Sequence, residues 1–410
     1  MTPNIPANIR AGIDRVQRIA LTVGVIGLAL CLIQLFLKPT AFFQSWLFAY
    51  LYWNGMVLGS VGILLMHNVV GGNWGVVIRR IAEAAASTIP ITFLGLIPVL
   101  LSVHTLYRWS NHDWVQSHPA VHIKLSYLNV PFWIGRAFIY FAILGVIAWR
   151  LRSLSIQQDR TGDAGIQARM RAFSAPMLVL FTLTGTFAFF DWIMSIEPEW
   201  YSTMYGAMFL VGQVLEALSF CVVVMFLLSG SKPFAGLLKI QHYHDLGNLM
   251  LAFTMLWAYT SFSQFLIIWS GNLPDEIPWY LRRFDGGWGF IGWFVSIFHF
   301  FVPFVLLLMR FVKKNPRLLF RVAAWMIFVR LIDVYWVSMP GLRRNGYTFE
   351  WTDVVAPIGL GGVWLWFFLY RLKSRPLLPL HDPRLGYHEL DTPVVQDTPG
   401  FRELGYGGNS

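Results

Sequence analysis

The sequence is poor in charge. Only 13% of its 410 residues are Asp, Glu, Lys or Arg, against roughly 25% in ordinary soluble domains. Hydrophobic residues make up 56% of the chain, with 34 Phe and 19 Trp among them. Several apolar runs approach or exceed the roughly 20 residues that a helix needs to cross a bilayer. These features exclude an ordinary soluble protein and indicate a polytopic membrane protein. The net charge of +10 does not require a nucleic-acid partner, because cytoplasmic loops of membrane proteins are basic.

Cysteine is also scarce. The two cysteines, Cys31 and Cys221, both lie within apolar runs, and neither CxxC nor CxxCH occurs. The chain is therefore not expected to ligate an iron–sulfur cluster or to attach c-type haem by itself. Residues 1–18 are polar, and no small-residue cleavage site follows the first apolar run, so we expect an uncleaved first helix.

Hydropathy predicts an all-α protein of about ten transmembrane helices. The third span contains Pro90 and Pro98, which favours a kinked or partly interfacial helix. We divide the chain into an N-terminal segment (1–18), a membrane domain (19–371) and a Pro-rich, polar C-terminal tail (372–410). The predicted spans are 19–37, 41–66, 84–107, 130–149, 174–192, 202–228, 245–270, 287–312, 318–338 and 351–371.

The basic residues predict the orientation. Most of the 31 Lys and Arg residues lie in the even-numbered loops and at the two termini. The positive-inside rule then places both termini in the cytoplasm. The odd-numbered, outer loops hold only Lys38, Arg108, Lys124, Arg282, Arg283, Arg343 and Arg344.

Three carboxylates lie at the predicted outer end of the fifth span, in the stretch FAFFDWIMSIEPEW. They are Asp191, Glu197 and Glu199, and no basic residue accompanies them. Carboxylates in this position suit proton exit or docking of an outer partner. The alternative is a solvated loop in which Asp191 pairs with an arginine.

Ionisable residues inside predicted spans are costly unless they are paired or face water, so they are candidate site residues. Glu216 lies near the middle of the sixth span, on the same helical face as Gln213. A proton-relay carboxyl and a neutral carboxyl that is hydrogen-bonded to a neighbouring helix are both consistent with this position.

Two arginines also lie within spans. Arg330 and Asp333 have i, i+3 spacing in the ninth span and could neutralise each other. Arg136 lies roughly 9 Å into the fourth span at 1.5 Å per residue. Because arginine stays protonated, it needs a carboxylate partner, which Asp191 or Glu216 could provide.

The histidines carry weaker signals. His299 lies near the middle of the eighth span, where a buried, hydrogen-bonded histidine is favoured over a haem ligand. His244 and Asp245 mark the inner end of the seventh span and could exchange protons with the cytoplasm, although an ordinary polar helix start explains them equally well. His104 belongs to a group of outer-loop histidines whose spacing matches no standard zinc motif. The GLGG sequence at 359–362 lies within an apolar helix and indicates close helix packing.

Two longer motifs carry a family resemblance. FDWIMSIEPEWYSTMYG at 190–206 and HDLGNLMLAFTMLWAYTSFSQFLIIWSGNLPDEIPWYLRR at 244–283 resemble the ActF-type, NrfD/PsrC-like membrane subunit of bacterial alternative complex III. That complex is a quinol:electron-acceptor oxidoreductase of respiratory or photosynthetic electron-transport chains. The ten-span layout is similar as well, so the resemblance covers nearly the whole chain.

The resemblance implies a fold of two four-helix bundles, spans 2–5 and 6–9, with spans 1 and 10 at the periphery. It implies a location in the bacterial cytoplasmic membrane beside a homologous NrfD-like subunit. Partner subunits would be a periplasmic iron–sulfur protein and c-type cytochromes, which would carry the iron–sulfur clusters and the haem c. Quinol would be oxidised near the outer face, mainly in the homologous subunit. The present chain would bind a quinone such as menaquinone or conduct protons, and no cofactor would be attached covalently. Of the residues in the matching motifs, the resemblance singles out Asp191, Ser195, Glu197, His244, Asp245, Gln264 and the loop 274–283.

The leading hypothesis is therefore a membrane subunit that supports quinol oxidation and proton translocation. The predicted proton path runs from His244 and Asp245 through Glu216 towards Asp191. A second set, which could bind quinone or form ion pairs, comprises Arg136, His104, Arg330 and Asp333. The alternatives are a secondary transporter, although no Gly/Pro-interrupted spans are evident at equivalent positions of two repeats, and a purely structural membrane anchor.

Overall fold

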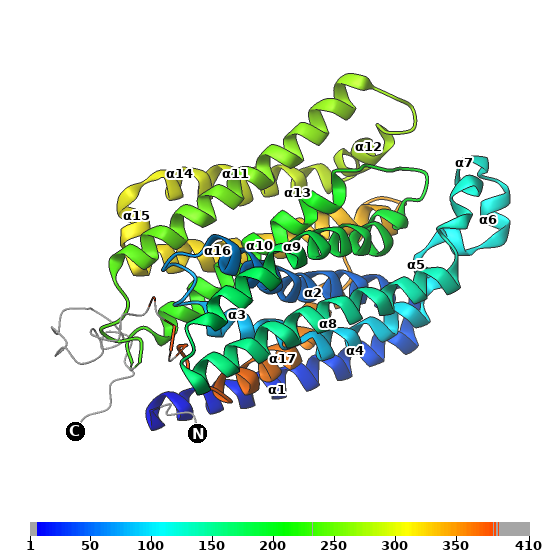
Figure 1. The fold of residues 1–410 in the computed structure, drawn as a ribbon. Helices are drawn as coiled ribbons and strands as arrows, with labels where there is room; N and C mark the ends of the chain where they lie inside the picture. The colour runs from blue at the N-terminus through cyan, green and yellow to red at the C-terminus, as the bar shows by residue number, and fades with distance from the viewer. Residues whose placement is uncertain (1–5, 232, 380, 383, 385–410) are drawn as a thin grey trace.

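The computed structural model describes residues 6–379 except 232, together with residues 381, 382 and 384. These residues form helices and connecting turns, with no strand among them (Figure 1). The helices are α1 (Ala7–Leu37), α2 (Pro39–Val70), α3 (Arg79–Ala86), α4 (Ile89–Leu101), α5 (Val103–Leu106), α6 (His112–Gln116), α7 (Pro119–His122), α8 (Val130–Thr161), α9 (Gly165–Trp192), α10 (Tyr205–Leu228), α11 (Ile240–Gly271), α12 (Pro278–Phe284), α13 (Trp288–Val295), α14 (Val302–Leu308), α15 (Arg310–Lys314), α16 (Pro316–Leu342) and α17 (Thr352–Lys373). Short 3-10 turns cover Arg108–Ser110, Ile123–Ser126 and Met194–Ile196, and a π-helical segment covers Ser296–Phe301.

Within the described residues, nine helical segments are long and apolar enough to cross a membrane. The predicted all-α membrane fold is confirmed. The ninth predicted span, 318–338, corresponds to α16, which has 27 residues but is not among these nine. The first helix begins at Ala7 rather than at 19. The third span is broken between α3 and α4, next to Pro90, as the kink prediction anticipated.

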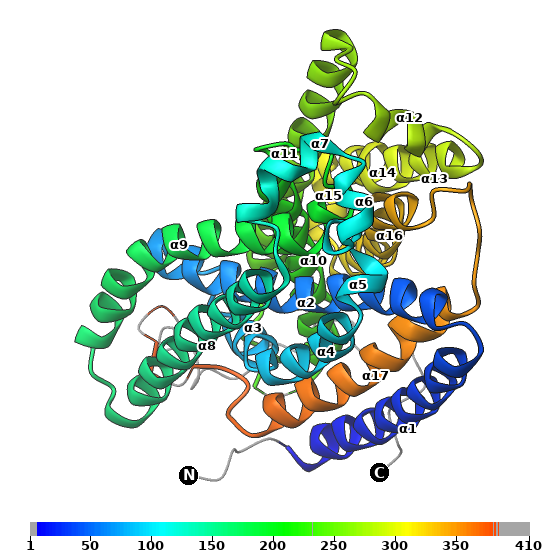
Figure 2. The same ribbon diagram turned by 90° about the vertical axis from the view of Figure 1, so that its right-hand side faces the viewer.

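The long helices form two groups of four. The first consists of α2, α8, α9 and the broken pair α3 and α4, and the second of α10, α11, α16 and the interrupted helix α13–α14. The groups meet where α2 packs against α10. Helices α1 and α17 pair along one side (Figure 2). Helix α17 also packs on α2, so it is less peripheral than α1.

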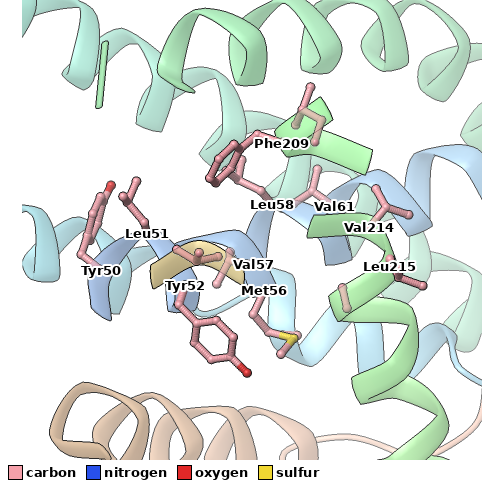
Figure 3. Packing of buried hydrophobic residues seen from close by; sticks show 14 of the residues in the cluster. Tyr50, Leu51, Tyr52, Met56, Val57, Leu58, Val61, Phe209, Val214 and Leu215 are labelled. Atoms are coloured by element: carbon pink, nitrogen blue, oxygen red, sulfur yellow. The ribbon is translucent and has the colours of Figure 1, made fainter. Parts of the chain in front are cut away.

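Small residues allow α2 and α10 to approach closely. Gly55 and Gly59 of α2 form a GxxxG pair, and a Cβ on either would collide with Gln213 of α10. Figure 3 shows hydrophobic side chains of both helices in the core, with Leu58 from α2 and Phe209 from α10.

Glycines also join α1 to α17. A Cβ on Gly27 would lie 2.6 Å from the Cα of Gly359, and a Cβ on Gly362 would lie 2.6 Å from the Cα of Gly24. The close packing predicted from the GLGG sequence is therefore confirmed.

The bundle has two ends. We call the end where α1 begins and α17 ends the terminal face, and the other end the opposite face. At the terminal face, Lys373 pairs with Asp14 at 2.6 Å. At the opposite face, Lys38 pairs with Glu350 at 3.2 Å. Both described chain ends therefore lie on the same face.

A buried ionic network anchors α3 at the terminal face. Every residue of α3 is buried. Arg79 pairs with Glu83 and Asp382, both at 3.0 Å, and Arg80 pairs with Glu83 at 2.6 Å and with Asp159. Asp382 lies in the predicted C-terminal tail, so part of that tail packs against the helices. Residues 385–410 of the tail lie outside the described residues.

Candidate functional site

Four ionisable side chains form a buried group in the middle of the second four-helix group. We call Glu216, His299, Arg330 and Asp333 the central cluster. Each is at most 2% exposed. They come from α10, from the π-helical segment and from α16, so that three helices must pack together to create the cluster.

Arg330 and Asp333 form an ion pair, as their i, i+3 spacing predicts. His299 joins them, with its Nδ1 4.0 Å from Oδ2 of Asp333, and the ring of Trp257 packs edge-on against the imidazole with centroids 4.3 Å apart. Gly212 of α10 leaves room for the guanidinium, because a Cβ there would lie 2.5 Å from Cζ of Arg330.

Glu216 completes the cluster without a direct hydrogen bond. Both of its carboxyl oxygens are buried and have no hydrogen-bond partner among the described residues. It lies within electrostatic range of Arg330 and Asp333. Burying an unpaired carboxylate is costly, so the site favours a neutral, protonated Glu216. The neighbouring amide of Gln213 is likewise buried without a partner among the described residues.

A cavity of about 430 Å³ opens beside the central cluster. Small-molecule sites typically measure roughly 300–1,000 Å³. Arg330 and Asp333 lie in its wall, and most of the remaining lining is aromatic or aliphatic. The aromatic lining residues are Phe209, Trp257, Phe262, Phe265, Trp279, Tyr280, Phe284, Trp293, Phe300, Phe301 and Trp336.

Several polar atoms on the lining residues lack partners. The buried Nε and Nη2 of Arg330, Oγ of Ser261 and Nε2 of Gln264 have no hydrogen-bond partner among the described residues. The other amide atom of Gln264, Oε1, accepts a hydrogen bond from Ser202 at 3.0 Å. Burial raises the pKa of Tyr280, another lining residue, to about 12, so its hydroxyl stays protonated. The cavity wall thus offers several hydrogen-bond donors in an apolar setting.

The wall of the cavity includes an irregular helix. The π-helical segment Ser296–Phe301 interrupts the eighth span just before Pro303. Single π-helical turns within α-helices are frequent at functional sites. Here the segment places His299 beside Asp333 and contributes Ser296 to the cavity wall.

A second buried ion pair lies in the first four-helix group. Nε and Nη2 of Arg136 donate to the two carboxylate oxygens of Asp191 at 2.7 and 2.8 Å, and the Tyr140 hydroxyl donates to the same carboxylate at 2.7 Å. Of the two partners predicted for Arg136, the structure selects Asp191. Asp191 is fully buried, so it does not lie in a solvated loop.

The other two carboxylates of the stretch FAFFDWIMSIEPEW differ from each other. Glu197 is 3% exposed and accepts hydrogen bonds from Arg282 at 2.5 Å and Arg283 at 3.0 Å. Glu199 is partly exposed and lies 3.4 Å from His118. The neighbouring loops at the opposite face therefore supply the positive charge that the motif itself lacks.

The remaining candidates lie apart from the cavity. His244 and Asp245 lie at the start of α11 on the terminal face, with 3.7 Å between Nδ1 and Oδ1. No hydrogen bond among the described residues links either of them to Glu216. His104 is exposed on α5, and neither it nor Arg136 lines the cavity. The second predicted set is therefore divided, and only Arg330 and Asp333 of that set lie at the cavity.

Charge alone did not reveal the apolar part of this site. The family motifs included Gln264 and the loop containing Trp279 and Tyr280, all of which line the cavity. Trp257, although it lies within the second family motif, and Trp293 were not singled out, because both are uncharged residues within predicted spans. The only available signal was the density of aromatic residues between 257 and 301.

Comparison with known proteins assigns the chain to no family. No family model matches the chain, and no curated protein is significantly similar to it. Within the described residues, no group of three or more His, Cys, Asp or Glu side chains is arranged to hold a metal ion.

Proposed function

We propose that this chain is the quinol-binding membrane subunit of a quinol-oxidising electron-transport complex of the alternative complex III type. One observation carries the proposal: the apolar cavity beside Arg330 and Asp333. The sequence resemblance supplies the rest, namely the homologous membrane subunit and the iron–sulfur and c-type cytochrome partners.

The cavity suits a quinol ring. Its aromatic walls can stack on a flat ring, and its volume falls within the usual range for small-molecule sites. The unpartnered donors on Arg330 and Gln264 match ring oxygens, which accept hydrogen bonds in both the quinol and the quinone. A ligand that met these donors would remove the cost of leaving them buried and unpaired.

The central cluster supplies proton acceptors. Quinol oxidation releases two protons and two electrons. Asp333, in the cavity wall, is the nearest candidate acceptor. Glu216 lies within electrostatic range of Asp333 but makes no direct hydrogen bond to it, so proton transfer between the two carboxyl groups requires a bridging water. The electrons would pass to redox centres in the partner subunits. Outward proton release would follow from the expected orientation, with both termini in the cytoplasm.

Quinone binding by the purified chain tests the proposal. We expect a short-chain menaquinone analogue to quench tryptophan fluorescence saturably in nanodiscs of neutral lipid, because Trp257, Trp279 and Trp336 line the cavity. Ser261→Phe places a phenyl ring in the cavity, in the space that the quinone ring would occupy. It should weaken binding at least about tenfold, which corresponds to a loss of about 1.4 kcal/mol.

The matched control is Leu266→Phe. Leu266 lies on the same helix, is 50% exposed and does not line the cavity. The Leu266→Phe variant adds the same phenyl ring at the lipid-facing surface, so the partition of the quinone into the membrane is unchanged. Equal quenching of both variants and the unmodified chain would refute the quinol site.

One observation favours a secondary transporter as the second candidate. The third span is broken between α3 and α4, and the eighth is interrupted by the π-helical segment. These spans occupy equivalent positions if the ten predicted spans are divided into two halves of five, although they are the second and third members of the two groups of four. Paired interrupted helices are typical of transporters. The sequence alone had not revealed this pairing. Copurification with haem- and iron–sulfur-containing partners would support the complex subunit, whereas solute transport by the isolated chain would support the transporter.

A further inference from the structure

A small basic hollow lies at the terminal face, well apart from the quinol cavity. It is formed by α3 and the turn after it, Arg152 of α8, and the last turn of α17 with the segment that follows it. Five charged side chains line the hollow, and only one of them, Glu83, is acidic. The basic ones are Arg80, Arg152, Arg371 and Arg375.

The acidic groups near the hollow are already engaged. Glu83 receives Arg80 at 2.6 Å and also Arg79 at 3.0 Å. Asp159 pairs with Arg80. These contacts leave Arg152, Arg371 and Arg375 without a carboxylate partner among the described residues.

The three remaining arginines have little other compensation. Nη1 of Arg152 reaches only the Ser87 hydroxyl, at 3.4 Å. Nε of Arg371 and Nη1 of Arg375 are buried with no hydrogen-bond partner among the described residues. Burial and, next, repulsion from Arg152 lower the pKa of Arg375 to about 10. Two buried guanidinium nitrogens therefore lack a partner in the part of the chain that the structure describes, and an anion in the hollow would stabilise the three cations that line it.

A lipid-facing surface begins next to the hollow. Ser87, in the wall of the hollow, lies two residues before α4. Helix α4 lies between α8 and α17 (Figure 2). Its residues Leu94, Ile97 and Leu101 are exposed, and their i, i+3, i+7 spacing places them on one face. On α8, the exposed Trp149 stands three residues before Arg152, as aromatic residues often do at membrane interfaces.

We propose that the hollow binds the phosphate of an anionic membrane phospholipid, whose acyl chains lie along the exposed face of α4. The arginines can hold phosphate oxygens through charge-assisted hydrogen bonds. The hollow measures about 10 Å³, room for roughly one water. It therefore admits one phosphate oxygen, and the rest of the headgroup stays at its mouth. The adjoining apolar face favours a lipid over a free phosphate as the source.

Thermal unfolding of the delipidated chain in neutral detergent tests the proposal. Phosphatidylglycerol should raise the midpoint of unfolding, and phosphatidylcholine at the same concentration should not. In Arg152→Gln/Arg375→Gln, the phosphatidylglycerol concentration needed for half of the shift should rise about a hundredfold, because two charge-assisted hydrogen bonds are lost. The matched control is Arg150→Gln/Arg171→Gln, which removes the same charge from exposed sites on α8 and α9 and should respond like the unmodified chain.

Three results would overturn the proposal. The first is an equal rise of the unfolding midpoint with phosphatidylcholine, and the second is an unchanged phosphatidylglycerol requirement in the Arg152/Arg375 variant. The third is a full rise of the midpoint with inorganic phosphate alone, which would identify a free-phosphate site. If that variant fails to fold, native mass spectrometry of the unmodified chain decides. Preferential retention of phosphatidylglycerol from an equal mixture with phosphatidylcholine supports the lipid site, and equal retention refutes it.

Discussion

Buried arginines in this protein differ in how fully they are satisfied. Arg136 has a bidentate carboxylate partner in Asp191 and a further hydrogen bond to the Tyr127 carbonyl oxygen at 2.9 Å. Arg330 pairs with Asp333 but leaves two of its nitrogens unpartnered among the described residues. A complete pair suits a structural role, whereas a pair with spare donors beside a cavity suits ligand binding.

The Arg136–Asp191 pair should behave as a structural unit. Asp191→Leu leaves the Arg136 guanidinium buried without its carboxylate, and we expect a loss of about 3–5 kcal/mol in unfolding free energy. The double variant Arg136→Met/Asp191→Leu removes both charges and should recover most of that loss. Denaturant unfolding in detergent measures both. A double variant as unstable as the single one would contradict this interpretation.

Glu216 should matter for turnover more than for stability. Glu216→Gln keeps the shape of the side chain but cannot exchange a proton, so quinol oxidation by the native complex should slow by about 10²-fold or more. Glu216→Asp should restore part of the rate. The control is Glu199→Gln at the opposite face, where the side chain is 38% exposed. Wild-type rates in Glu216→Gln would exclude Glu216 from the proton path.

Small residues allow particular pairs of helices to pack in close contact. Gly55 and Gly59 bring α2 against α10, and Gly27 and Gly359 bring α1 against α17. Between lipid-exposed helices there is little hydrophobic driving force, so close backbone packing contributes much of the attraction. Another small residue, Gly212, lets α10 approach α16, because a Cβ there would lie 2.5 Å from Cζ of Arg330.

Adding side-chain volume between α1 and α17 should separate them. Gly27→Val would place its Cβ 2.6 Å from the Cα of Gly359, where neither backbone can yield easily. We expect a loss of about 1–3 kcal/mol in unfolding free energy, as for other overpacked sites. Gly12→Val on the same helix is the control, because nothing lies within 4 Å of its Cβ. Equal stability of the two variants would argue against glycine-mediated docking of α1.

At the scale of the whole molecule, the two faces differ in how they are built. The terminal face holds the α3 ionic network and the basic hollow, whereas the opposite face holds the turns around α6, α7 and α12 (Figure 1). The charge bias of the sequence predicts that the terminal face meets the cytoplasm.

Cysteine labelling tests this orientation. Cys31 and Cys221 are 1% and 0% exposed, so they should contribute little background. A membrane-impermeant maleimide added to right-side-out vesicles should label the variant Asp113→Cys. The Asp113 side chain lies at the opposite face and is 99% exposed. Arg169→Cys, at a side chain that is 57% exposed at the terminal face, should be labelled only after permeabilisation. The reverse pattern would invert the proposed topology.

The amino-acid sequence alone predicted the class of this protein and most of its membrane segments, because hydropathy is a local property of each stretch of chain. It also predicted the Arg330–Asp333 pair, whose members are one helical turn apart. It identified Glu216 as a charge within a span without establishing what surrounds it, and it placed Asp191 at the outer end of the fifth span.

Which distant groups meet depends on the fold. It paired Arg136 with Asp191 rather than with Glu216, placed Glu216 near Arg330 and Asp333, and left His104 exposed. It also created the aromatic cavity and the basic hollow. The physical reason is that such contacts depend on the rotation and separation of packed helices. Those are set by small residues and ion pairs acting between segments far apart in the chain.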